Sequence, residues 1–428
     1  MRVLWVTQAK ISISQKHVAS GGWTVGALKA LVSRDDMEMH YAYLHNDTED
    51  YCEDGVHFWG IAPLNGLKYP QKTEDDIYQL IMKIDPEVIH CWGTETPITL
   101  AAVRAAKKAG LIDRVVINIQ GMLKYCEGTF TKTGVPGLKF PGIRPIELAT
   151  RTSTYSLLQA FRKRLPYEME AVCSVKHLIG RTPIDRTFAL QQASQAKYHK
   201  CNETLREAFY DKEKWSALNM QRHSIFMSET DYPIKSLDKM FEALAIISRR
   251  YDDVQLYIAG QDVFCERKLG KQPWDSIPAW IKRNGYQTYL FKLAKKLNIK
   301  DRVHFIGRQT AEEMRQQYLI ANVYACTSIV ENESNSLSEA MITGTPSVVS
   351  FAGGMTGRIS DGVDGFFYPW NEPWQLADRI MQIFDDDNLA ENFSKNAIDK
   401  MSKIVDRQTN LERMLEIYGE VITYESGE

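Results

Sequence analysis

The chain has 428 residues, of which 44% are hydrophobic and 25% charged, with a formal net charge of -2 at pH 7. This length suffices for two α/β domains with separate cores, and 52 Lys and Arg against 54 Asp and Glu do not favour a nucleic-acid partner. Seven scattered cysteines lack disulfide or metal-ligand spacing. No apolar run reaches the ~20 residues of a membrane span, and the N-terminus predicts a strand rather than a signal peptide. We therefore expect a cytoplasmic protein.

Short β-branched runs alternate with helical patterns along the first half of the chain. Strands are predicted at Met1–Thr7, Val88–Trp92 and Val115–Ile119, and a helix at Ile98–Lys107. This alternation is typical of parallel sheets built from β-α-β units. Between the first strand and the next helical pattern, the loop Ser20–Gly22 is rich in glycine, so Gly21 and Gly22 either hold a phosphate or form a plain tight turn.

The pattern starts afresh at His223–Ser228, after the charged stretch Glu203–Lys214, which we expect to be a helical linker between two Rossmann-like domains. The later predicted elements are Gln255–Ala259, Phe291–Leu297, Val303–Ile306, Met314–Leu319 and Val323–Cys326. Helical spacing of apolar residues predicts a final helix over Asn410–Tyr424. We expect the first domain to comprise residues 1–210 together with 408–428, and the second residues 211–407.

Two glutamates flank a predicted turn from a strand to a helix in the second half. The buried-type strand Asn322–Ser328 precedes Glu331 on a polar loop, and Ser336–Glu339 predicts a capping box at the start of the helix. Free N–H groups at a helix N-terminus attract phosphate, and the two carboxylates could grip hydroxyls on either side of a diphosphate. Taken alone, the pair is better explained by a helix-cap residue, Glu339, and a solvated loop acid, Glu331.

The surrounding motif is more specific than the two glutamates. Glu331 and Glu339, with seven residues between them, are followed by Gly344–Pro346, a strand and Gly353–Gly354. This unit resembles the signature of the group 1 glycosyltransferases, also called glycosyltransferase family 4. Asp85–Trp92 and Asp361–Pro369 resemble two further segments of that family. The resemblance implies the α/β fold called GT-B, in which two Rossmann-like domains face a cleft and a C-terminal helix crosses back to the first domain.

The resemblance also assigns roles around the donor. Glu339 would bind ribose hydroxyls, and Glu331 would bind the hydroxyls of the transferred sugar. The backbone N–H groups of Asn335, Ser336 and Leu337 would hold the phosphates.

The segment around Lys235 matches the family pattern at one position and departs from it at two. Lys235 matches the diphosphate-binding lysine, but Thr230 replaces the arginine five residues earlier and Ser236 replaces the glycine that follows. The resemblance therefore leaves Arg308 or Arg181 as other sources of positive charge, and Arg181 is also a candidate on the acceptor side.

Gln120 stands where the family commonly has a histidine that reaches the transferred sugar. Its amide donates and accepts hydrogen bonds but does not change charge near neutral pH. The resemblance implies retention of anomeric configuration, with the leaving phosphate assisting deprotonation of the acceptor, so that Gln120, Lys235 and Glu331 position groups and stabilise charge. This scheme requires neither a metal nor a cofactor.

The acceptor is less well defined by the sequence. Lys124–Lys163 is predicted to form long loops that become helical. There, Leu158, Phe161 and Leu165 lie beside a basic run, a pattern that suits either an anionic membrane surface or core packing. The insertion Phe264–Lys282, with Trp274 and Trp280, is either a second acceptor contact or surface decoration.

The sequence thus predicts a retaining hexosyltransferase that moves a sugar from a nucleotide diphosphate sugar, UDP-linked, to a glycan or lipid-linked glycan. The expected setting is bacterial polysaccharide or capsule assembly, with peripheral contact at the inner face of the plasma membrane. Two alternatives stay open. A nucleotide-sugar 2-epimerase shares the fold, and a non-catalytic sugar-nucleotide-binding subunit is compatible with Thr230 and Gln120.

Overall fold

The computed structural model describes residues 1–11, 22–47, 49–64, 66, 68–132, 147, 153–228, 230, 232–266 and 277–425. These residues form two compact units. The first unit contains Met1–Lys124, Ala160–Arg206 and Ile404–Glu428, and the second contains Tyr125–Gln159 and Glu207–Lys403. None of the described helices is long and apolar enough to cross a membrane.

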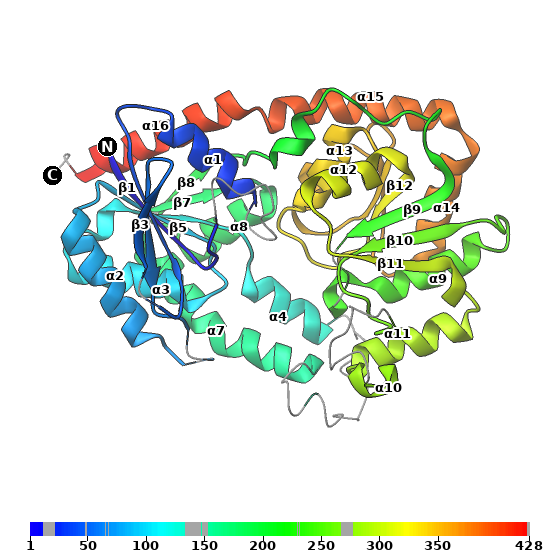
Figure 1. Ribbon diagram of the computed structural model, residues 1–428, viewed down its shortest axis with the longest axis horizontal. Helices are drawn as coiled ribbons and strands as arrows, with labels where there is room; N and C mark the ends of the chain where they lie inside the picture. Colours follow the sequence, from blue (N-terminus) through cyan, green and yellow to red (C-terminus); the bar gives the residue numbers. More distant parts are fainter. Residues whose placement is uncertain are drawn as a thin grey trace. The chain divides into compact units, whose positions relative to one another are not determined.

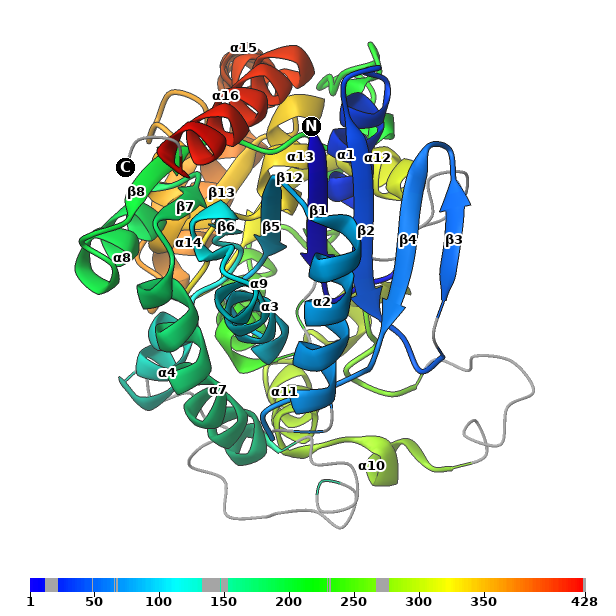
Figure 2. The same ribbon diagram turned by 90° about the vertical axis from the view of Figure 1, so that its left-hand side faces the viewer.

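The described residues of the first unit build an eight-stranded sheet in the order β3-β4-β2-β1-β5-β6-β7-β8 (Figure 2). The strands are β1 (Arg2–Thr7), β2 (Glu38–Leu44), β3 (Asp50–Glu53), β4 (Val56–Ile61), β5 (Val88–Trp92), β6 (Val115–Asn118), β7 (His177–Gly180) and β8 (Lys197–Lys200). All neighbouring strands are parallel except β3 and β4, which form an antiparallel edge pair. The chain order reverses between β1 and β5, so this sheet is doubly wound.

Helices cover both faces of this sheet, as a buried parallel sheet requires. They are α1 (Gly22–Val32), α2 (Gln71–Ile84), α3 (Pro97–Lys108), α8 (Pro183–Gln192) and α16 (Arg407–Glu425), together with parts of α4 (Leu123–Lys132) and α7 (Thr154–Ser174). One core cluster joins Trp5 of β1, Leu28 of α1 and Tyr418 of α16, and the Trp5 indole donates a hydrogen bond of 2.9 Å to the Tyr418 hydroxyl. The C-terminal helix therefore packs on the first unit, which confirms that prediction.

The second unit contains a six-stranded parallel sheet in the order β11-β10-β9-β12-β13-β14. Figure 1 labels four of these strands, β9, β10, β11 and β12. The strands are β9 (Gln221–Ser228), β10 (Gln255–Ala259), β11 (Val303–Gly307), β12 (Ala321–Cys326), β13 (Ser347–Ser350) and β14 (Phe366–Tyr368). Read in chain order this is 3-2-1-4-5-6, the doubly wound arrangement, and the order reverses between β9 and β12. The predicted class, two Rossmann-like α/β units, is confirmed.

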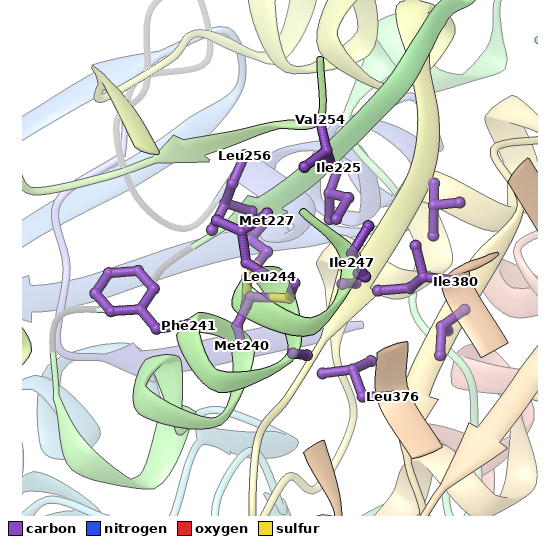
Figure 3. Close-up of a cluster of buried hydrophobic side chains, with 14 of the residues drawn as sticks. Ile225, Met227, Met240, Phe241, Leu244, Ile247, Val254, Leu256, Leu376 and Ile380 are labelled. Atoms are coloured by element: carbon purple, nitrogen blue, oxygen red, sulfur yellow. The ribbon is translucent and has the colours of Figure 1, made fainter. Parts of the chain in front are cut away.

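The core of the second unit lies between its sheet and several helices, among them α9 (Leu237–Ile247) and α14 (Pro373–Asp385). Figure 3 shows Ile225 and Met227, alternate residues of β9, directed at the helical side chains Leu244 and Ile380. Further described helices of this unit are α10 (Ala279–Lys282), α11 (Gly285–Lys296), α12 (Ala311–Ile320), α13 (Asn335–Thr343) and α15 (Asp387–Ile404).

Three local predictions were wrong in whole or in part. The stretch Glu203–Lys214 is not a helix; it holds only a 3₁₀ turn at Glu207–Tyr210. Its apolar residues Leu205 and Phe209 are nevertheless buried. The start of Lys124–Lys163 belongs to α4 rather than to a loop. Most of 133–152 lies outside the described residues. Residues 267–276 of the insertion Phe264–Lys282, which include Trp274, also lie outside them. The predicted capping box at Ser336 is replaced by a cap at Ser334.

Candidate functional site

The strongest candidate site lies in the second unit, at the carboxyl ends of β9 and β12. In a doubly wound sheet, ligands bind in the crevice where the strand order reverses, and these two strands flank that point. Lys235 follows β9 and ends the 3₁₀ turn Pro233–Lys235. Glu331 follows β12 on the loop that leads to α13. The fold thus brings together two residues that are 96 positions apart in the chain.

Lys235 and Glu331 form an ion pair, with 2.8 Å between the lysine Nζ and the glutamate Oε2. Their side chains are 15% and 17% exposed, so a ligand can reach them without unfolding the unit. Burial alone lowers the pKa of the Lys235 ammonium, but the Glu331 carboxylate and the Tyr232 side chain outweigh burial and hold this pKa well above its ordinary value. Lys235 therefore carries a full positive charge at neutral pH.

Backbone contacts fix the positions of both partners. Thr327 Oγ1 donates to the Lys235 carbonyl over 2.7 Å, and Gly354 N–H donates to the Glu331 carbonyl over 2.9 Å. Gly353 has a φ of +53°, and a Cβ there would lie 1.9 Å from the Glu331 carbonyl oxygen. Only glycine allows that left-handed backbone and that close approach at low cost. The predicted Gly353–Gly354 turn thus serves the loop of Glu331.

The N-terminus of α13 adjoins the Glu331 loop. Ser334 is the N-cap, and its hydroxyl accepts the Leu337 N–H at 3.2 Å, so Leu337 is already engaged. The first N–H groups of a helix have no intrahelical acceptor, which leaves those of Asn335 and Ser336 for a ligand. Glu339 is the fifth residue of this helix and is only 4% exposed, so it lies deeper in the unit than a first-turn cap residue would.

The positions that depart from the family pattern have distinct surroundings. Thr230 follows β9 and is 2% exposed, and its Oγ1 has no hydrogen-bond partner among the described residues. Ser236 adopts a left-handed backbone with φ 54°, a conformation that costs a serine more than the family's glycine. Arg308 follows β11 and is exposed. The strand β10 separates β11 from β9, the strand that precedes Lys235. Arg308 is therefore not part of the Lys235–Glu331 cluster.

The first unit holds a second polar cluster at the carboxyl ends of its strands. Arg181, after β7, donates from Nη1 to Glu203 Oε2 over 2.5 Å and from Nη2 to Gln120 Oε1 over 3.3 Å. The Gln120 amide nitrogen in turn donates to Glu203 Oε1 over 2.5 Å and to Asn118 Oδ1 over 2.8 Å. The Arg181 charge is thus neutralised by Glu203, and the orientation of the Gln120 amide is set by three neighbours. Gly22 is the first residue of α1, and Gly21 lies outside the described residues.

Sequence reasoning missed a pair of carboxyl groups close to Gln120. Glu168 of α7 is 1% exposed and accepts hydrogen bonds from Thr94 Oγ1 at 2.8 Å and from the Leu123 N–H at 3.0 Å. Burial raises its pKa to about 7, and the nearby Glu95 carboxylate adds to the increase. A Cβ on Gly121 would lie 2.5 Å from Glu95 Oε1, so this glycine makes room for the carboxyl group. No local sequence pattern marks either glutamate.

Sequence reasoning also missed an ion pair beside the Lys235–Glu331 site. Glu333 and Arg358 contact each other, and their side chains are 6% and 5% exposed. Glu333 lies two residues after Glu331, but its partner is 25 positions further along the chain, so sequence alone could not pair them. Within the described part of the chain, no group of three or more His, Cys, Asp or Glu side chains is arranged to hold a metal.

The fold and the site define a class of protein: two doubly wound α/β units, with a charged pair at the switch point of the second. Residues 211–400 match the family model described as "Glycosyl transferases group 1". The second unit is therefore a group 1 glycosyltransferase domain, as the motif around Glu331 predicted.

Individual relatives cover parts of the chain or share its fold. A D-inositol 3-phosphate glycosyltransferase of Corynebacterium kroppenstedtii is 31% identical over 111 residues, which are 26% of this chain and 25% of the relative. The chain thus spans about a quarter of that protein's length. The sucrose-phosphate synthase of Thermosynechococcus elongatus superposes with a TM-score of 0.70 at 14% identity, covering 99% of both chains. Anabaena HepE, solved in complex with UDP-glucose, gives 0.68 at 16% identity over 98% of this chain and 100% of that one.

Proposed function

We propose that the protein is a glycosyltransferase that moves a sugar from a nucleoside diphosphate sugar to an acceptor hydroxyl, with retention of anomeric configuration. The observation that carries the proposal is the Lys235–Glu331 ion pair at the switch point of a group 1 glycosyltransferase domain. The pair supplies one group for each half of such a donor, because the ammonium suits the diphosphate and the carboxylate suits sugar hydroxyls.

Donor binding exchanges the partners of this pair. The diphosphate takes Lys235 Nζ together with the N–H groups of Asn335 and Ser336, and Glu331 turns to the hydroxyls of the sugar. As the sugar–phosphate bond breaks, negative charge grows on the departing diphosphate, and the fixed positive charge of Lys235 stabilises it. Thr230, whose buried hydroxyl has no partner among the described residues, is a further donor contact.

The donor is proposed to be UDP-linked, which the UDP-glucose complex of HepE supports by likeness of fold. Glu339 as the ribose-binding residue and Gln120 as a group that reaches the sugar stay predictions. A glycan or lipid-linked acceptor, polysaccharide or capsule assembly and peripheral membrane contact stay predictions as well. Arg181 is the weakest acceptor candidate, since Glu203 already takes its charge.

The variant Glu331→Gln tests the proposed exchange. Affinity for UDP, which lacks the sugar, should stay within about twofold of wild type, while donor turnover with UDP-glucose should fall by at least about tenfold. Calorimetry measures the first quantity, and release of UDP with and without a panel of acceptors measures the second. The control is Glu242→Gln, because Glu242 pairs with Lys239 at 2.9 Å on α9 of the same unit. Wild-type turnover in Glu331→Gln would remove this residue from the chemistry.

The same assay separates the two alternatives. A non-catalytic subunit would bind UDP-glucose and release no UDP with any acceptor. A 2-epimerase would convert the sugar of UDP-N-acetylglucosamine, and chromatography of the recovered sugar detects that product.

A further inference from the structure

The loop that carries Glu331 contains a second carboxylate with a different partner. Glu331 pairs with Lys235, whereas Glu333 contacts the Arg358 guanidinium. The Glu333–Arg358 pair is the more deeply buried of the two, with side chains 6% and 5% exposed against 17% and 15%. A ligand entering between β9 and β12 can therefore reach the first pair, while the second is enclosed by the unit.

Arg358 belongs to the element that already supports the backbone of Glu331. It follows the 3₁₀ turn Gly353–Gly357, whose Gly354 N–H donates to the Glu331 carbonyl at 2.9 Å. The Arg358 side chain adds a second connection from the same element, two residues further along the loop at Glu333. The loop is thus tied to this turn by one backbone hydrogen bond and one buried ion pair.

We propose that the Glu333–Arg358 pair is a positioning element that sets the place of the Glu331 carboxylate relative to Lys235, and that sugar discrimination depends on it. This inference rests on the proposed function. An isolated polar loop can occupy several conformations, and a displacement of about 1 Å at a reacting group can reduce turnover ~100-fold. A buried ion pair is a poor source of net stability, but in some proteins such buried polar groups specify a single geometry.

Two single variants, Glu333→Gln and Arg358→Met, test the proposal by activity in the full-length chain. Turnover with UDP-glucose should fall by about 10- to 100-fold, with UDP affinity within about twofold of wild type. The preference between UDP-glucose and its 4-epimer UDP-galactose, measured as a ratio of kcat/KM values, should approach one, since a displaced Glu331 no longer tests each hydroxyl.

Control variants distinguish positioning from loss of fold. Arg315→Met removes another buried arginine of the second unit, which is 5% exposed and pairs with Asp211, Glu213 and Glu312. It should lower the melting temperature and leave the sugar preference of the folded fraction unchanged. Arg358→Lys keeps the charge without the planar fork of the guanidinium and should restore part of the turnover lost in Arg358→Met.

The outcomes are decisive in either direction. If both single variants fold and keep wild-type turnover and sugar preference, or if Arg315→Met changes the preference as much as they do, the positioning role is wrong. If the single variants fail to fold, the double variant Glu333→Leu with Arg358→Met supplies the test. A buried ion pair can be replaced by apolar side chains with little loss of stability. Wild-type turnover and sugar preference in that double variant would also overturn the positioning role. Absence of UDP and UDP-glucose binding by the wild-type protein would instead contradict the proposed function itself.

Discussion

Both units place a cation–carboxylate pair at the carboxyl ends of a doubly wound sheet, but the two pairs differ in their access to solvent. In the second unit, the side chains of Lys235 and Glu331 are 15% and 17% exposed. In the first unit, those of Arg181 and Glu203 are 2% and 6% exposed. The Lys235–Glu331 pair flanks the switch point of its sheet, whereas Arg181 and Glu203 follow β7 and β8 at one edge of the other sheet. The two pairs thus differ both in their place in the sheet and in their access to a ligand.

The type of cation agrees with this division. Arg181 uses two nitrogens of its planar guanidinium to hold Glu203 and Gln120 in one fixed arrangement. Lys235 is a compact point charge that can exchange one anionic partner for another. Opening the Lys235–Glu331 pair for a diphosphate leaves both groups near solvent or ligand, whereas opening the Arg181–Glu203 pair would strand buried charges. We therefore propose that Arg181 supports Gln120 rather than binding a ligand directly.

The largest effect that follows from this comparison is on stability. Arg181→Met should lower the free energy of unfolding by about 3–5 kcal/mol, because it leaves Glu203 as an uncompensated buried charge. Urea denaturation followed by circular dichroism measures the loss. Lys235→Met is the matched variant in the second unit and should cost distinctly less, since Glu331 can turn to water. Equal losses would show that exposure does not separate the two pairs.

The second effect is on catalysis. Lys235→Ala should lower turnover of the donor by at least ~100-fold, equivalent to about 2.7 kcal/mol, the cost of losing one preorganised electrostatic group. Lys239→Ala is the control, because Lys239 also pairs with a glutamate of its unit at 2.9 Å. Steady-state release of UDP from UDP-glucose gives the ratio. A decrease of less than about tenfold would mean that another cation serves the phosphates.

The elements of the sheets could be predicted because their burial is written into local sequence. β5 and β10 have the bounds that the apolar runs Val88–Trp92 and Gln255–Ala259 indicated, and α16 follows from the apolar spacing in Asn410–Tyr424. Edge elements such as β3 were missed, since a half-exposed strand of four residues has no continuous apolar run.

The site could be predicted only where a motif spans a short stretch of chain. Glu331 and the Gly353–Gly354 turn were found in this way. The cap was misplaced because Ser334, Asn335 and Ser336 are all good N-cap residues, and packing rather than residue type selects Ser334. The Glu333–Arg358 pair depends on contacts between distant segments, which no local pattern contains.

The enclosed character of the first unit extends to a histidine beneath α16. His90 of β5 is wholly buried, and its Nδ1 lies 2.7 Å from the Tyr418 hydroxyl. Trp5 donates to that hydroxyl oxygen, and a neutral His90 ring with an unprotonated Nδ1 can accept a hydrogen bond from the Tyr418 hydroxyl. Burial lowers the pKa of His90 to about 3.

The smallest predicted effect is the pH dependence that His90 gives to folding. The pKa of His90 in the folded protein lies below its value of about 6.5 in the unfolded chain. As the pH falls, the unfolded state therefore takes up the proton first. The contribution of His90 to stability is complete above pH ~6.5 and declines as the pH falls towards about 3. Between pH 6.5 and 5.5 this loss should be about 1 kcal/mol. Glu168, with its raised pKa of about 7, contributes with the opposite sign in this range, so the total for wild type does not isolate His90. The difference in unfolding free energy between wild type and His90→Gln isolates the contribution of His90, because Glu168 is common to both proteins. That difference should shrink by about 1 kcal/mol over this pH interval. A constant difference for His90→Gln would show that the enclosed interior of the first unit accepts a charge.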